Sequence, residues 1–238
     1  MNFDYEKHTI LRGVGGSHAY GLNVEDSDID YVGIIIPPKD YFLGLYRFDQ
    51  YEGKHENGEY HLHDIRKFFR LALKSNPNIL EILFLDKYEI VTPYGQRILD
   101  IRHEFISRNC LTPYLGYANS QLKRFQKLTW ENVTSERRLG IIKNAGYDAK
   151  YAMHLIRLLK TGIEVLTTGQ LIVKRPDRQM LLDIRNGLYT FEQIVIMSRT
   201  LYSKLEACKE NNVLKSSPDY KKVNDVLVSI VEDFLKGK

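Results

Sequence analysis

Two aspartates near the start of the chain, Asp28 and Asp30, are the residues whose type and spacing most directly suggest chemistry. One residue separates them, so in a strand both carboxylates would emerge on the same face and repel each other. A divalent cation would relieve this repulsion, because Mg²⁺ prefers oxygen ligands and commonly takes one or two carboxylates together with substrate phosphates. The sequence therefore predicts a cation site, for Mg²⁺ or Mn²⁺, at the start of a strand.

The segments around these acids have the pattern of short strands. YVGIII, which follows Asp30, is apolar and rich in β-branched residues, as in a buried strand. TILRGVGGS predicts an earlier strand that ends in glycines, and a turn or short helix should follow around residues 20–25. Residues 51–58 are polar and contain two glycines, which favours a hairpin or loop. EYHLH then predicts a strand with Glu59, His61 and His63 on one face.

The rest of the chain has mostly helical periodicity. Asp64 is placed to cap a helix over IRKFFRLALKS, and a second helix is predicted over ILEILFL. From about Pro93 onward, amphipathic segments bounded by Pro, Gly, Ser or Asn follow one another, one of them spanning residues 144–169. We therefore expect an α/β (α+β) protein, with a small mixed sheet in residues 1–92 and an α-helical domain in residues 93–238.

Composition places the chain among ordinary globular proteins. Its 238 residues are 43% hydrophobic and 27% charged, and its two cysteines match no metal or redox spacing. No apolar run approaches 18 residues, and the polar start MNFDYEKH does not resemble a signal peptide. These features predict a cytoplasmic protein without membrane segments.

Charge is distributed unevenly along the chain. Residues 1–60 hold 5 Lys/Arg and 11 Asp/Glu, whereas the remaining residues hold 29 and 19. The acidic first quarter favours a cation site and the basic remainder favours phosphate binding. An acidic N-terminal region also argues against a plain nucleic-acid-binding protein.

A family resemblance rests on several of these motifs together. GGSHAYG followed by DSDIDYVG resembles the signature of the polymerase-β-like nucleotidyltransferases, in which a Gly-Ser turn precedes a strand with an Asp-x-Asp pair. RKFFRLALKSNPNILEILF, YAMHLIRLL and LDIRNG resemble one branch more closely, the predicted bacterial and phage nucleotidyltransferases related to an RNA-repair-associated group. The resemblance runs from the first strand to about residue 190, most of the chain.

The resemblance implies roles for the motif residues. Gly16 and Ser17 would hold the nucleotide's β- and γ-phosphates through backbone N–H groups and a hydroxyl. Asp28 and Asp30 would be catalytic and would hold two Mg²⁺ (or Mn²⁺) ions. By position, Glu59 would be the third catalytic and metal-binding carboxylate, at a place where relatives usually carry Asp, so this side chain is one methylene longer.

Other readings of the polar residues remain open at this point. Asp64 is the rival for the third carboxylate, although its position favours a helix cap. Asp26 is either a support for the metal ligands or a turn residue. A zinc site would use the imidazoles of His18, His61 and His63, but no cysteine or obvious fourth ligand accompanies them.

A set of basic and polar residues recurs at steps of four, three, four and three in the second half of the chain. The set holds no acid, which favours phosphate binding over an ordinary solvated face. The resemblance implies that KYAMHLIRLL lies against the catalytic cleft, which makes Lys150, His154 and Arg157 nucleotide-binding residues. The full set, with two arginines that could extend it, is Lys143, Tyr147, Lys150, His154 and Arg157, together with Arg175 and Arg185.

These observations predict an enzyme that transfers a nucleoside monophosphate from an NTP, with ATP as the expected nucleotide, to an acceptor hydroxyl. An RNA end, a protein side chain and a small molecule are all open as the acceptor. The alternative is a catalytically silent nucleotide-binding or regulatory module of the same fold, for which Glu59 in place of Asp is the main argument.

Overall fold

The computed structural model describes residues 3–25, 27–56, 58–126, 133, 135–210 and 213–237. It divides into two compact units: a sheet unit, Met1–Ser107 with Ser217–Lys238, and a helical unit, Arg108–Ser216. This division differs from the expected one after residue 92, because residues 93–107 and the C-terminal helix belong with the sheet. Sequence periodicity identifies helices but not what they pack against.

The sheet unit contains a mixed five-stranded sheet in the order β3-β4-β2-β1-β5, which confirms the expected fold class. β2 and β4 run parallel, and the other neighbours are antiparallel. β3 and β4 form the hairpin that the sequence predicts. The strands are β1 (Thr9–Val14), β2 (Asp30–Ile35), β3 (Gln50–His55), β4 (Gly58–Asp64) and β5 (Ile90–Val91).

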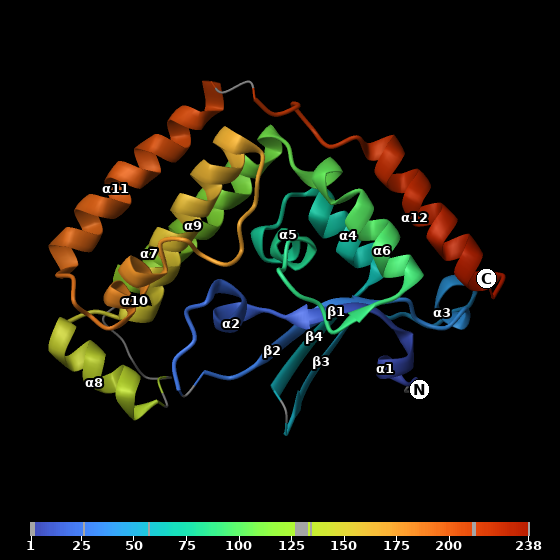
Figure 1. The fold of residues 1–238 in the computed structure, drawn as a ribbon, viewed down its shortest axis with the longest axis horizontal. Coiled ribbons are helices and arrows are strands. Elements are labelled where there is room, and N and C mark those ends of the chain that lie inside the picture. Colours follow the sequence, from blue (N-terminus) through green and yellow to red (C-terminus); the bar gives the residue numbers. More distant parts are fainter. Residues whose placement is uncertain are drawn as a thin grey trace. The chain divides into compact units, whose positions relative to one another are not determined.

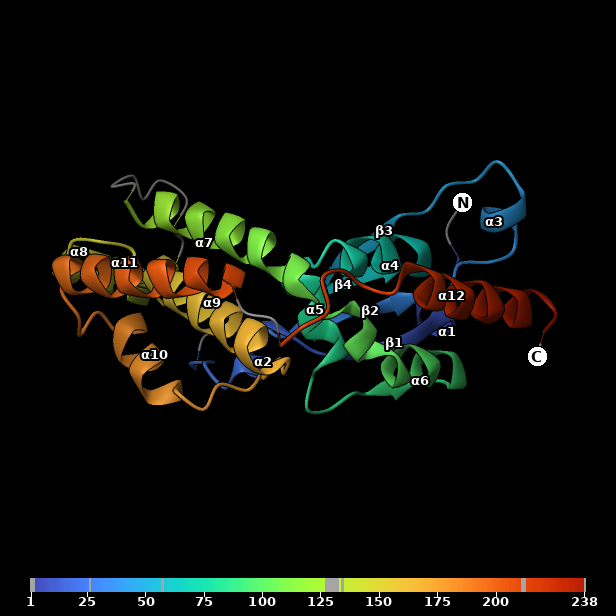
Figure 2. The ribbon, with the colours of Figure 1, turned by 90° about the horizontal axis from the view of Figure 1, so that it is seen from above.

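Helices cover one face of this sheet, where α4, α5 and α6 lie together (Figure 1). Phe68 and Phe69 of α4 are buried, as the apolar spacing of that segment predicts. α12 packs against α4 and α6, as the view from above also shows (Figure 2). The helices of the unit are α1 (Tyr5–His8), α2 (Gly16–Tyr20), α3 (Asp40–Leu43), α4 (Ile65–Leu73), α5 (Pro77–Leu83), α6 (Pro93–Asp100), the 3-10 helix η1 (Arg102–Phe105) and α12 (Tyr220–Leu235).

Two ion pairs hold α12 on the sheet unit. Arg97 of α6 donates to Asp233 at 2.8 Å, and Lys222 donates to Glu104 at 2.7 Å. Apolar contacts accompany them, since Val223 and Ile230 of α12 are fully buried. The last helix therefore completes the helical layer formed with α4 and α6, although more than a hundred residues separate it from its ion-pair partners.

The helical unit is built around α9, whose buried residues lie on several sides because α7, α10 and α11 all pack on it. Its elements are η2 (Arg108–Cys110), α7 (Leu111–Gln126), α8 (Glu136–Ala145), α9 (Ala149–Thr168), α10 (Arg178–Arg185), α11 (Phe191–Ala207) and η3 (Cys208–Glu210). Among the described residues, no helix is long and apolar enough to cross a membrane.

The expected single helix over residues 144–169 is wrong, because a break separates α8 from α9. Gly146 ends α8 in the left-handed conformation, with a φ of +75°, which a glycine adopts without strain. Asp148 then caps α9 by accepting a hydrogen bond from the backbone N–H of Lys150 at 3.1 Å. Both end signals were present in the sequence, but apolar periodicity continued across them.

Candidate active site

The Gly-Ser turn lies directly against Asp30. β1 ends at Val14, and α2 begins at Gly16, whose φ is +56°. A Cβ atom added at Gly16 would lie 1.8 Å from Asp30 Oδ2, far inside any permitted contact. The backbone N–H of Gly15 also donates to the carbonyl of Asp30 at 2.7 Å. Only glycine at position 16 allows this close approach between the turn and the carboxylate.

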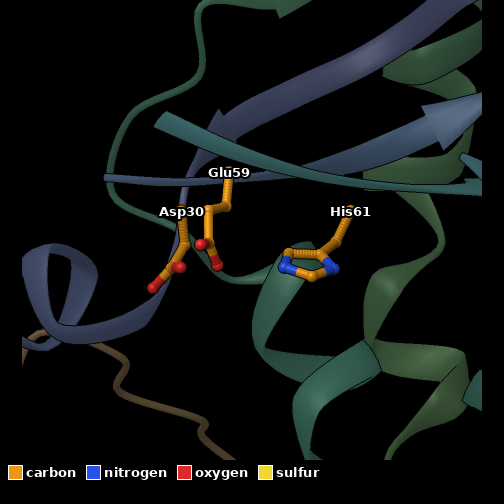
Figure 3. Close-up of side chains that lie close together, drawn as sticks. All are labelled: Asp30, Glu59 and His61. Carbon is orange, nitrogen blue, oxygen red and sulfur yellow. The ribbon is translucent and has the colours of Figure 1, made fainter. Parts of the chain in front are cut away.

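Asp30 and Glu59 face each other across two parallel strands. Asp30 is the first residue of β2, and Glu59 is its partner in the register of β4. One ligand atom from each of Asp30, Glu59 and His61 lies within 4.8 Å of the others. Figure 3 shows the two carboxylates side by side and the His61 ring beside them. The structure thus brings Asp30 and Glu59 together, two of the three carboxylates expected to bind metal.

Asp28 lies outside the strand, since β2 begins only at Asp30. The expected arrangement of both acids on one strand face is therefore not the one observed. Asp28 is exposed, and its charge acts on Lys54, the ion-pair partner of Glu59. The Glu59 carboxylate, and then the Asp28 carboxylate, raises the pKa of Lys54.

Lys54 balances part of this negative charge. Its ammonium group lies 3.0 Å from the Glu59 carboxylate, across the β3–β4 hairpin. The Lys54 side chain is exposed and that of Glu59 is partly exposed, so water screens the pair and it contributes little to folding. A divalent cation could compete with Lys54 for Glu59 at little cost.

Asp64 caps α4, as its position in the sequence predicts. Its carboxylate accepts hydrogen bonds from the backbone N–H groups of Arg66 at 2.8 Å and of Lys67 at 3.1 Å, and it pairs with the Arg66 guanidinium at 2.9 Å. The side chain is only 1% exposed. These contacts occupy the carboxylate and favour Glu59 over Asp64 as the third acid.

Replacing Asp64 tests this assignment. We expect Asp64→Ala to lower the free energy of unfolding by about 2 kcal/mol, because a helix cap is lost and Arg66 loses its partner. Asp64→Asn should cost less, since asparagine caps a helix about as well. Urea unfolding measures both. Asp64→Asn should also keep its transfer activity, and an inactive but folded variant would contradict the assignment.

The three histidines that were considered as zinc ligands lie in different environments. The His18 ring contacts the carbonyl of Ser27 at 3.2 Å, and burial is the largest cause lowering the pKa of His63 to about 4. Across the described residues, the one potential metal-binding group contains only His61 of the three. The histidines therefore form no common site there. Asp26 lies outside the described residues.

In the helical unit, the predicted basic set is split between two helices and the turn joining them. Lys143 belongs to α8, and Lys150, His154 and Arg157 belong to α9. Tyr147 lies in the turn and is buried, with its hydroxyl donating to the carbonyl of Tyr189 at 2.6 Å. Lys143 and Lys150 are exposed, whereas Arg157 is only 3% exposed. The predicted basic set therefore contains both exposed and buried residues.

His154 is surrounded by cations. Burial, followed by the charges of Arg157, Lys150, Arg185 and Arg138, holds the pKa of His154 well below its usual value. Arg185 therefore lies near His154, in agreement with its suggested place beside the basic set. Arg138 does not fall on the spacing of the predicted set, and its pairing with Asp148, which caps α9, could not be predicted from periodicity. Cations gathered in this way favour anions, and the Asp148 carboxylate beside Arg138 offsets part of their charge.

The depressed pKa of His154 predicts an acid-sensitive helical unit. The folded protein keeps this ring neutral while the unfolded chain protonates it near pH 6.5, so the free energy of unfolding should fall as pH drops below about 6.5. The effect of one proton is at most about 1.4 kcal/mol per pH unit. Melting temperatures between pH 7.5 and 5 should fall less in His154→Gln, whereas His103→Gln, at an exposed histidine, should follow the unaltered protein. Equal slopes in all three proteins would contradict the assignment.

Arg175 does not join the basic set. Its buried guanidinium pairs with Glu164 at 3.2 Å and with Asp177 at 3.0 Å, and it donates to the Thr161 hydroxyl. Lys160 also pairs with Asp177. Arg175 therefore belongs to a charge-balanced internal network rather than to the basic set.

Comparison with known proteins gives the family of the chain. A 130-residue stretch is 26% identical to an uncharacterized 38.9 kDa protein from the nrdC-mobD intergenic region of Enterobacteria phage T4, and covers 49% of this chain and 38% of that protein. A crystal structure of a nucleotidyltransferase-like protein from Exiguobacterium sibiricum 255-15 superposes with a TM-score of 0.30 at 12% identity, over 95% of this chain and 74% of that one. The family match itself covers residues 4–229. The chain belongs to the RlaP family, the RNA repair pathway DNA polymerase beta family.

Proposed function

We propose that the protein is a metal-dependent nucleotidyltransferase that moves a nucleoside monophosphate from an NTP to an acceptor hydroxyl. The observation that carries the proposal is the direct opposition of Asp30 and Glu59 across β2 and β4, with the Gly16 turn in contact with Asp30. Two like charges in direct opposition are destabilising, and the single positive charge of Lys54 balances only part of them. Oxygen donors of this kind fit Mg²⁺ or Mn²⁺.

Asp30 and Glu59 would hold the cation, and Asp28, just before the strand, would complete the set. When bound, the cation would lower the pKa of the acceptor hydroxyl and stabilise negative charge on the departing pyrophosphate. The carboxylates themselves would fix the position of this charge. Their placement on neighbouring strands of a packed sheet makes the geometry rigid.

We assign Gly16 and Ser17 to the triphosphate. Without a Cβ at position 16, a phosphate could approach the backbone N–H groups of the turn closely, and the Ser17 hydroxyl adds a donor. Ser17 is partly exposed, so its hydroxyl is accessible. These groups would orient the α-phosphorus for attack by the acceptor.

Lys150, His154 and Arg157 are proposed as a second phosphate-binding set, in the helical unit. Lys150 is exposed and would contact phosphate directly. Arg157 is buried, and we expect it to act through its positive potential. His154 stays neutral at pH 7 and would offer a hydrogen bond without adding charge.

ATP is our proposed donor, and an RNA end is the acceptor favoured by the family's description as an RNA repair pathway group. Incubation of the full chain with each α-³²P-labelled NTP, Mg²⁺ or Mn²⁺, and either RNA with a free 3′-hydroxyl or a protein mixture tests the proposal. Label on RNA or protein, absent without metal, is the expected result. Metal-dependent NTP binding without any transfer would instead favour the catalytically silent module.

A further inference from the structure

We propose that the imidazole of His61 is a nitrogen ligand at this metal site and makes the site prefer Mn²⁺ to Mg²⁺. The inference rests on the proposed function, which supplies Asp30 and Glu59 as ligands. It adds a ligand that the Asp-x-Asp motif does not include, and it predicts which of the two cations binds more tightly.

The alternation of β4 places His61 beside Glu59. Side chains two residues apart on a strand share a face, and Figure 3 shows both on the same side of the sheet as Asp30. One ligand atom from each of the three lies within 4.8 Å of the others. Opposite ligands of an octahedral ion with bonds of about 2.1 Å are about 4.2 Å apart, so small rotamer changes would close the three around one cation.

Nothing in the described part of the chain competes for the His61 ring. Its nitrogens form no hydrogen bond to any described residue, and the side chain is half-buried at the edge of the acidic pair. In the register of the hairpin, exposed Glu52 on β3 lies opposite His61. His63, one step further along the same face, is not among the three residues that converge.

An imidazole ligand changes which cation the site selects. Mg²⁺ demands oxygen ligands and gives up its water reluctantly, so a nitrogen donor adds little to its affinity. First-row transition ions accept nitrogen donors, and among them Mn²⁺ is the one best suited to carboxylates, although its affinity for nitrogen is the lowest of the series. Two carboxylates and one imidazole therefore suit Mn²⁺ better than Mg²⁺.

Electron spin-echo spectroscopy of Mn²⁺ bound to the full chain tests the inference without any reaction. Imidazole coordination gives a ¹⁴N modulation on the Mn²⁺ signal. We expect this modulation in the unaltered protein and its loss in His61→Ala and His61→Gln, the second of which keeps most of the side-chain volume. His103→Ala, at an exposed histidine of η1, is the matched control and should keep it.

Titration calorimetry with Mn²⁺ and with Mg²⁺ provides the second measurement. We expect His61→Ala to weaken Mn²⁺ binding at least tenfold and Mg²⁺ binding less than threefold, with circular dichroism verifying the fold of each variant. Bound Mn²⁺ that depends on Asp30 but shows no ¹⁴N modulation would overturn the inference and leave the proposed function standing. Modulation that persists in both His61 variants would also overturn it. Failure of the unaltered protein to bind either cation would overturn both proposals.

Discussion

Asp30→Asn and Glu59→Gln are each expected to reduce metal-dependent nucleotidyl transfer by at least about 10³-fold. Each change removes a charged ligand from a cation that would stabilise charge in the transition state, and a loss of about 4 kcal/mol corresponds to that factor. Steady-state transfer of α-³²P label at saturating NTP measures the effect. In Asp30→Asn, relief of the repulsion between the two opposed carboxylates should leave the metal-free melting temperature level or raise it, whereas Glu59→Gln should change it little, because this variant also loses the ion pair with Lys54.

Two further variants separate this effect from a general loss of charge. Glu59→Asp should keep most of the activity, because it keeps a carboxylate at this position of β4. Asp100→Asn makes the same chemical change on the exposed surface of α6 and should leave transfer unaffected. Full activity in both Asp30→Asn and Glu59→Gln would remove these residues from the active site, and so would equal losses in Asp100→Asn.

The sequence predicted those features of the fold that are encoded locally. The β3–β4 hairpin follows from a polar glycine-containing stretch before an alternating strand, and the cap at Asp64 follows from one acid before an amphipathic helix. The two-residue strand β5 was not predicted, because so short a segment has no period. The return of α12 to the sheet depends on pairs such as Arg97 with Asp233, 136 positions apart, which no local pattern specifies.

The candidate site shows the same division between local and distant information. The Asp-x-Asp spacing predicted Asp30 as a metal ligand. It also predicted both aspartates on one strand, but β2 begins only at Asp30, so Asp28 lies outside it. The opposition of Asp30 and Glu59 needs the parallel register of β2 and β4, which sequence alternation alone does not give. His61 shares a face with Glu59 by simple alternation, yet its approach to Asp30 appears only once the strands are paired.

Gly16→Ala should reduce turnover at least about 10²-fold, although it adds a single methyl group. The new Cβ would lie 1.8 Å from Asp30 Oδ2 and 2.9 Å from its Cγ, so the carboxylate would have to move by roughly 1.5 Å to reach ordinary contact. A displacement of about 1 Å in a reacting group can cost about 10² in rate. The φ of +56° adds about 1–2 kcal/mol of strain for any residue with a Cβ. Transfer kinetics and urea unfolding measure the two effects.

Gly146→Ala is a control that separates the cost of backbone strain from the effect of displacing the Asp30 carboxylate. Gly146 has a φ of +75°, but a Cβ there would meet nothing within 4 Å, so its replacement should lower stability by a similar amount and leave transfer unchanged. Gly16→Ala should differ from it in activity and in the binding of Mn²⁺, because only Gly16 sets the position of a proposed metal ligand. If both alanine variants lose stability alike and both keep full activity, the close packing of the turn on Asp30 serves only the fold. If only Gly16→Ala is inactive and it also binds Mn²⁺ more weakly, the methyl group acts through the carboxylate, which would make Gly16 a positioning residue for Asp30. Inactivity with unchanged Mn²⁺ binding would instead place the effect at the triphosphate.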